Sequence, residues 1–157
     1  MDQDELIDFI IYAKKRGYAN ISEATEVIKY EKSGAIKIII RRGDWEYTDK
    51  YVGSKSFIGH EVVYYKGKPV WSMSYHGRVQ TDDETTKQHL TAFLKNALAQ
   101  VDKDSIFRGP RIYMESDFTY INTFHGSLEF FSGEEMISQK PNTGLLYELR
   151  YNGGSIR

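Results

Sequence analysis

The sequence predicts an α+β protein whose sheet is mostly antiparallel, strongly curved and built of hairpins, with two main helices packed on one face. Two amphipathic stretches predict the helices, and many short β-branched and aromatic stretches predict the strands. Turn residues separate neighbouring strands, which favours hairpins over the long crossovers of a parallel sheet. The chain has 157 residues and no linker or evident internal repeat, so residues 1–157 are expected to form a single domain.

The first helix is predicted over residues 3–16. Its apolar face consists of Leu6, Phe9, Ile10 and Ala13, which recur at helical spacing. Gly17 follows as a stop signal. The segment from Ile21 to Lys32 is ambiguous between a short helix and a loop.

Strands are predicted from Ala35 onward. The β-branched run AIKIII indicates a strand, and a turn near Gly43 follows it. The next stretch, WEYTDKYV, places Trp45, Tyr47, Asp49 and Tyr51 on one side of a strand. A central hairpin is then expected around Lys66-Gly67, since glycine supplies the positive φ that a tight turn requires.

The second helix is predicted in DDETTKQHLTAFLKNALAQV, capped by Asp82 or Asp83. Its buried stripe consists of Leu90, Phe93, Leu94, Ala97, Leu98 and Val101. The C-terminal third is expected to form the short strands FTYINTF, SLEFF, EMISQ and GLLYELRY. The turns between them are placed at His125-Gly126, Ser132-Gly133 and 141–144, with Glu134 and Glu135 exposed in a turn.

Composition excludes several classes of protein. The chain has no cysteine, which removes disulfides, thiolate nucleophiles and cysteine-bound zinc. The net charge of −1 is unlike that of a dedicated nucleic-acid binder, so direct DNA binding is not expected. Acidic residues precede the first apolar run, the reverse of a signal peptide, and no run is long enough to span a bilayer. A cytoplasmic protein without membrane contact is therefore expected.

Familiar catalytic motifs are missing from the sequence. There is no HExxH, GxSxG, P-loop or GxGxxG pattern. His60 and His76 flank the central hairpin, but they are not directly opposite and lack a third ligand, so no metal or other cofactor is expected. The residues proposed for ligand binding are Glu61, Trp71, Tyr75, Arg78, Arg108 and Glu148. Aromatic rings supply contact area, and the two guanidinium groups match carboxylate or phosphate geometry.

Several ordered segments resemble an uncharacterised bacterial family of unknown function. The stretch FIGHEVVYYKGKPVWSMSYHGRV carries three of them, and FLKNAL, FRGP and YELRYNGGSIR carry the rest. Members of that family occur alone or C-terminal to Xre-type helix-turn-helix regions. The resemblance implies a sensing or interaction module. Only one helix is predicted before the strands, so no helix-turn-helix region is expected in this chain.

Two functions follow from these observations. The first is a stand-alone sensor, a ligand-binding or protein-interaction domain that takes a small polar or anionic ligand or a protein partner. The second is a small enzyme, a hydrolase or toxin-like nuclease, that uses Glu61 or Glu148 with His76 or His125. The sequence decides neither whether the protein is an enzyme nor whether it forms a homodimer.

Overall fold

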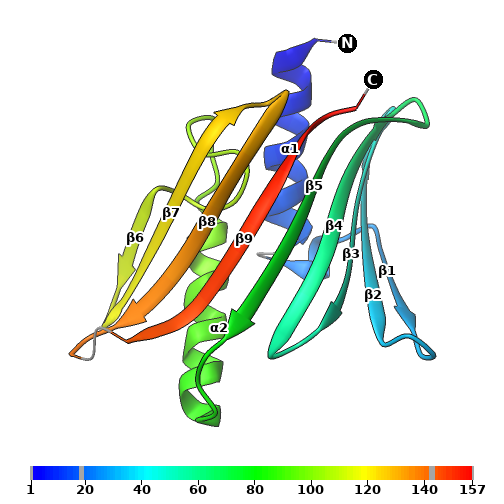
Figure 1. The fold of residues 1–157 in the computed structure, drawn as a ribbon. Coiled ribbons are helices and arrows are strands. Elements are labelled where there is room, and N and C mark those ends of the chain that lie inside the picture. Colours follow the sequence, from blue (N-terminus) through cyan, green and yellow to red (C-terminus); the bar gives the residue numbers. More distant parts are fainter. Residues whose placement is uncertain (1, 18–19, 142–143, 157) are drawn as a thin grey trace.

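A computed structural model describes residues 2–17, 20–141 and 144–156 (Figure 1). Two helices and nine strands form the fold. The elements are α1 (Gln3–Gly17), β1 (Glu26–Tyr30), β2 (Ala35–Arg42), β3 (Trp45–Gly53), β4 (Ser56–Tyr65), β5 (Lys68–Val79), α2 (Glu84–Leu98), β6 (Ile112–Glu115), β7 (Phe118–Ser127), β8 (Phe130–Gln139) and β9 (Leu145–Ser155). A 3-10 turn, Ile21–Glu23, follows α1.

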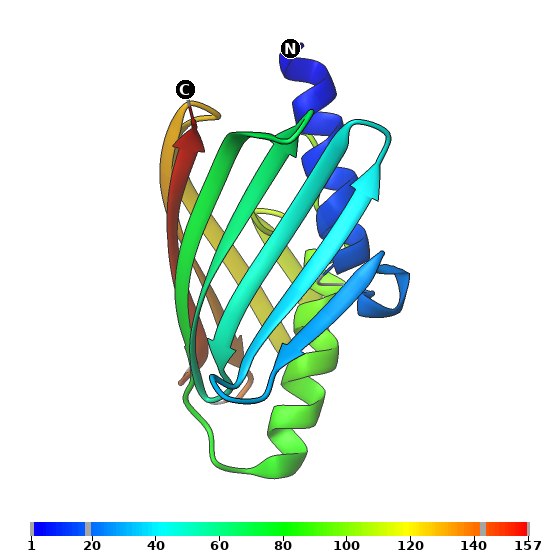
Figure 2. The same cartoon turned by 90° about the vertical axis from the view of Figure 1, so that its right-hand side faces the viewer.

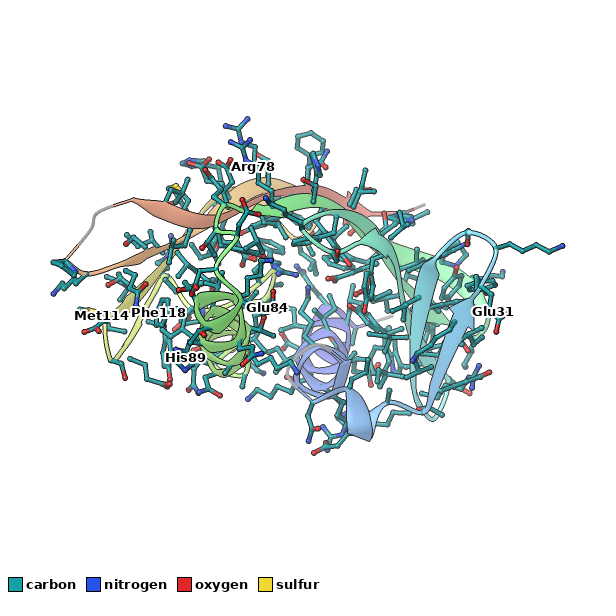
Figure 3. All side chains as sticks on the ribbon, turned by 90° about the horizontal axis from the view of Figure 1, so that it is seen from below. Glu31, Arg78, Glu84, His89, Met114 and Phe118 are labelled. Carbon is teal, nitrogen blue, oxygen red and sulfur yellow. The ribbon has the colours of Figure 1, made fainter. Side chains whose placement is uncertain are left out.

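The strands form one antiparallel sheet in the order β1-β2-β3-β4-β5-β9-β8-β7-β6. This confirms the predicted α+β class with a mostly antiparallel sheet. The predicted strong curvature is not found: the sheet is open, and β1 and β6 remain two separate edges. Figures 2 and 3 show both helices on the same side of the sheet. We call this the helix side and the opposite one the open side.

Local signals explain where the helices begin and end. Asp83 caps α2, because its carboxylate accepts a hydrogen bond of 2.7 Å from the backbone N–H of Thr86. In α1, acidic side chains occupy the first turn and basic ones the last, which suits the helix dipole. The apolar faces of both helices are buried in the same core as the inward-facing strand residues. Within the described part of the chain, no helix has the length and apolar character that crossing a bilayer requires.

The central hairpin has the predicted turn, in which Lys66 and Gly67 both adopt positive φ, 50° and 77°. The ambiguous segment contains the 3-10 turn and the edge strand β1. The C-terminal turns were partly misplaced. β7 continues through His125-Gly126, β8 contains Ser132-Gly133, and the chain turns at Leu128-Glu129 instead. The predicted turn at 141–144 includes residues 142–143, which lie outside the described residues.

Glu135 is the main error of this misplacement, since it was expected to be exposed and is 0% exposed. Gly133 was read as a turn signal, but it lies within β8 beneath the ring of Tyr151. A Cβ atom at Gly133 would come within 2.4 Å of that ring. Glycine in a strand often marks such a close approach.

The structure also corrects the expectation that the chain has no internal repeat. The first half, α1 with β2–β5, and the second half, α2 with β6–β9, have the same order of elements, and β1 is additional. In the helices, Leu6, Phe9, Ile10 and Ala13 correspond to Leu90, Phe93, Leu94 and Ala97. In the strands, Tyr47, Asp49, Tyr51, Phe57, Glu61, Trp71 and Tyr75 correspond in order to Tyr120, Asn122, Phe124, Phe131, Glu135, Tyr147 and Tyr151.

Strand register supports this correspondence. Asp49 lies opposite Glu61 in the first half, and Asn122 lies opposite Glu135 in the second. The halves meet at β5 and β9, where Tyr75 lies directly opposite its counterpart Tyr151. This is the pairing that an approximate two-fold axis between the two halves requires.

Candidate functional site

A buried cluster of ionised groups lies on the helix side, between the sheet and the chain that follows α2. Lys14 of α1 contacts Glu61 at 2.7 Å. Arg108 lies between the halves, with two hydrogen bonds to Glu135 at 2.7 and 3.2 Å and a longer contact of 3.9 Å to Glu61. The four side chains are at most 8% exposed, so each buried charge is balanced by an opposite one.

Glu135 is the best satisfied carboxylate of the cluster. Tyr120 and Tyr147 donate hydrogen bonds of 2.6 and 2.7 Å to it. Burial alone would raise the pKa of Glu135. The charge of Arg108 and the hydrogen bonds from Arg108 and the two tyrosines outweigh burial and lower this pKa. Glu135 is therefore held as a carboxylate.

Lys14 is held less firmly as a cation. Burial lowers the pKa of Lys14, and Arg108 lowers it further, while Glu61 opposes both effects. The ammonium group of Lys14 also donates a hydrogen bond of 2.5 Å to the carbonyl oxygen of Phe107. This bond joins α1 to the segment that carries Arg108.

Asp49 is the carboxyl group of this region with the most strongly raised pKa. Burial and the charge of Glu61 raise the pKa of Asp49 from 3.8 to about 7, although the hydroxyl of Tyr75 donates a 2.8 Å hydrogen bond to it. Its counterpart is the neutral Asn122, whose side-chain oxygen accepts a 2.7 Å hydrogen bond from Tyr151. The two halves thus keep the tyrosine and differ in the group that accepts from it.

The six proposed ligand-binding residues do not form one site. Glu61, Trp71, Tyr75 and Arg108 are buried on the helix side, none more than 3% exposed. Arg78 and Glu148 lie on the open side, where Arg78 is paired with Glu148. Figure 3 shows Arg78 pointing away from the helices. The alternation of side chains along strands separates the two groups.

The histidines of the enzyme hypothesis lie on the open side. His76 and His125 border a shallow depression of about 590 Å³ together with Ile58, Ser74, Glu134 and Arg150. Glu61 faces the helices, so the sheet itself separates Glu61 from His76. Glu148 shares the open side with His76, and it already accepts hydrogen bonds from Arg78 and Gln80.

A cleft of about 430 Å³ lies between the ends of both helices and the sheet of the first half. Its walls are mainly apolar and aromatic. They include Ile36, Ile38, Tyr51, Phe57, Tyr75, Val79, Leu90, Leu94 and Tyr147. Tyr75 and Tyr147 also belong to the buried network, because their hydroxyls donate to Asp49 and Glu135. The rings of these tyrosines therefore separate the cleft from the buried charges.

Polar groups at the mouth of the cleft come from Ser54, Thr91 and Lys95. Lys95 lies on the exposed side of α2, and among the described residues its ammonium group has no ion pair. The neighbouring lysines differ in this respect, since Lys55 is paired with Asp82 and Lys87 with Glu84. Lys95 thus gives the mouth a positive charge available to a ligand.

Sequence reasoning identified Tyr75 but missed the other rings of the cleft. Tyr51 was correctly placed on the same side as Tyr47 and Asp49, and Leu90 and Leu94 were correctly placed on the buried stripe of α2. That these two surfaces leave a space between them depends on how the helix and the sheet meet. No local pattern in the sequence contains this information.

One family matches the chain: residues 49–156 match the family described as "Domain of unknown function (DUF5680)". The match begins at Asp49 and includes both glutamates of the buried cluster, α2 and all strands from β4 onward. No curated protein and no solved structure matches the chain. Since the match covers more than half of its residues, the chain belongs to the DUF5680 family, whose function is unknown.

Proposed function

We propose that this protein is a small-molecule-binding domain and that its ligand occupies the cleft between the two helices and the first half of the sheet. The observation that carries the proposal is a space of about 430 Å³ lined by four aromatic rings and aliphatic side chains. Ligand sites are usually concave, largely apolar spaces of about 300–1,000 Å³ with a few polar groups. Ser54, Thr91 and Lys95 supply those polar groups at the mouth.

Binding fits this structure better than catalysis. Glu61 is engaged by Lys14 and lies near Arg108 in the buried cluster, so it has no free path to a substrate. Ionised groups that are fully paired with each other and hydrogen-bonded stabilise one arrangement of the core. The cluster holds β4, β8 and α1 together and leaves the cleft beside it open for a ligand.

We extend the proposal to a sensing role. The signature segments resemble those of bacterial domains found alone or C-terminal to Xre-type helix-turn-helix regions. A domain that binds a small molecule would serve such a regulator as its sensor in the cytoplasm. This chain would act as the stand-alone form of that module and would signal through a protein partner or a second copy of itself.

The test compares two threonine-to-tryptophan variants of α2. Thr91 lines the cleft, so Thr91→Trp should fill the mouth with an indole ring. Thr85 is exposed on the first turn of the same helix and does not line it, so Thr85→Trp is the matched control. Native mass spectra of the freshly purified proteins, beside their denatured masses, would show any co-purified ligand.

The expected result is a ligand mass in the wild type and in Thr85→Trp that is lost in Thr91→Trp. If the wild type carries no ligand, a thermal-shift screen of small metabolites replaces the spectra, and the hits should stabilise the same two proteins. Hits that stabilise Thr91→Trp as well as the wild type would show that the ligand binds elsewhere and would contradict the proposal.

A further inference from the structure

The second half of the molecule contains a filled counterpart of the cleft. Phe107, in the segment between α2 and β6, is 3% exposed. Its ring stacks on Phe131 of β8 with centroids 3.7 Å apart and planes inclined by 10°. The edge of Phe124 of β7 meets it at 5.2 Å and 86°. The chain thus inserts its own aromatic ring between two rings of the sheet.

The two rings that hold Phe107 have counterparts in the first half, Phe57 for Phe131 and Tyr51 for Phe124. Both Phe57 and Tyr51 line the open cleft and are half-buried. The glycine beneath each phenylalanine is repeated too. A Cβ atom at Gly77 would come within 2.5 Å of Phe57, and one at Gly153 within 2.7 Å of Phe131.

The surrounding ring geometry is also repeated. Phe57 stacks with Tyr147 at 6.2 Å and 24°, and Phe131 stacks with Trp71, the counterpart of Tyr147, at 5.6 Å and 14°. The angle between Phe57 and Tyr75 is 63°, and that between Phe131 and Tyr151 is 53°. The two sites therefore present similarly arranged aromatic walls.

Only the occupant differs between the two sites. In the first half, the chain between α1 and β2 forms the 3-10 turn and the edge strand β1. From that segment, the described residue that reaches the cleft is Ile21, which is 41% exposed at its border. Among the described residues, no side chain takes the stacking place on Phe57 that Phe107 takes on Phe131.

We infer that the cleft binds a ligand with a single flat aromatic ring, whose face stacks on Phe57 and whose edge faces Tyr51, as Phe107 lies on Phe131 and Phe124. Stacked and edge-to-face ring pairs contribute about 0.5–1.5 kcal/mol beyond the burial of area. Lys95 at the mouth favours an acidic substituent on that ring over a basic one. This inference deepens the proposed function and depends on it.

The test uses three probes of similar size: 3-phenylpropionate, 3-cyclohexylpropionate and 3-phenylpropylamine. Each is titrated into the ¹⁵N-labelled protein, and amide shift changes give its site and its dissociation constant. We expect 3-phenylpropionate to shift amides of β4 and α2 around the cleft. It should bind about 3- to 10-fold more tightly than the cyclohexyl acid, as the ring-pair energy predicts. The amine should bind more weakly than the phenyl acid.

Two phenylalanine-to-leucine variants show whether Phe57 causes the preference. Phe57→Leu should remove most of the difference between the phenyl and cyclohexyl acids. Phe130 is 82% exposed and does not line the cleft, so Phe130→Leu is the matched control and should keep the difference.

The outcomes separate the two proposals. Equal affinity of the phenyl and cyclohexyl acids at the cleft would overturn the aromatic inference and leave the proposed function standing. Binding of an aromatic peptide at the cleft without binding of the phenyl acid would overturn the small molecule as its occupant. Absence of any shift at the cleft, together with equal ligand binding by Thr91→Trp and the wild type, would overturn both proposals.

Discussion

In the second half of the sheet, Phe107 covers Phe131, and the neutral Asn122 accepts the hydrogen bond of Tyr151. In the first half, the corresponding Phe57 borders an open cleft, and the ionisable Asp49 accepts the hydrogen bond of Tyr75. One framework of strands and rings is thus present in two forms. The second half completes its core with its own chain, and the first half leaves the equivalent space accessible.

The difference indicates that the open cleft is not required for folding. The second half shows that a loop residue can fill this space. The first half nevertheless keeps the aromatic rings that the filled site uses, and their exposure lowers stability, because apolar area left in water stabilises nothing. Retention of these rings beside an open cleft is the pattern expected when the occupant comes from outside the chain.

The largest effect is expected from Arg108, which joins the glutamates of both halves. Arg108→Leu would leave Glu61 with Lys14 alone and would remove the cation that faces Glu135. Breaking a buried ion pair on one side costs about 3–5 kcal/mol, and we expect the upper end of that range. The free energy of unfolding, measured in urea, gives the loss.

The control for Arg108 is Arg78→Leu on the open side. Arg78 is 59% exposed and is also paired with a glutamate, so its loss should have a small effect, within about 1 kcal/mol. Equal losses in the two variants would show that the buried cluster does not join the halves as described.

The second prediction empties the filled site. Phe107→Ala should destabilise the protein by about 3–4 kcal/mol, because it removes a buried ring and leaves a cavity over Phe131. An apolar cavity of this kind can bind benzene. Benzene should therefore raise the melting temperature of Phe107→Ala more than that of Phe130→Ala, an exposed control. Failure of benzene to do so would mean that the site collapses and does not mirror the cleft.

The extent to which sequence reasoning succeeds differs between the halves for a physical reason. In the first half, turn residues and alternation predicted β2, β3 and the Lys66-Gly67 hairpin, because local conformation determines each of them. In the second half, Ser132-Gly133 imitated a turn, although Gly133 is required beneath the ring of Tyr151. A contact between distant strands thus had a local signature that indicated something else.

The candidate site was only partly predictable for a related reason. Glu61, Tyr75 and Arg108 were selected by chemistry, and they do lie on one side of the sheet. Glu135 was missed because the false turn placed it in solvent. The internal repeat was missed because its identities are spaced through strands and separated by loops of unequal length. Aligning the strand registers, which needs the structure, makes the repeat evident.

The third prediction makes the first half resemble the second through Asp49→Asn. The pKa of Asp49 is raised to about 7 in the folded protein from 3.8, so the folded state binds a proton more tightly than the unfolded state. Asp49 therefore makes stability fall as pH rises from about 4 to about 7. Asparagine does not titrate, so the variant should gain on the order of 2 kcal/mol over the wild type between pH 5 and pH 8.

Urea unfolding of both proteins at pH 5 and pH 8 measures this gain. The reciprocal variant, Asn122→Asp, is the control and should acquire a pH dependence of the same sign as that of Asp49. The amide of Asn122 donates a 2.8 Å hydrogen bond to the carbonyl of Gly109, and an ionised carboxylate there would repel that oxygen. A constant difference between Asp49→Asn and the wild type at both pH values would show that Asp49 is ionised throughout.

The smallest expected effect compares the two counterpart phenylalanines directly. Phe131 is 1% exposed and stacks closely on Phe107, whereas Phe57 is half-buried at the cleft. Phe131→Leu should therefore lower the free energy of unfolding by about 1 kcal/mol more than Phe57→Leu, since it loses a complete stacking partner and more buried area. A saturating cleft ligand should reverse the order of sensitivity. Ligand binding stabilises the folded state in proportion to affinity, and Phe57→Leu would lose part of that stabilisation while Phe131→Leu keeps it. Equal losses with and without the ligand would mean that Phe57 serves the core as Phe131 does, and that the two sites differ only in exposure.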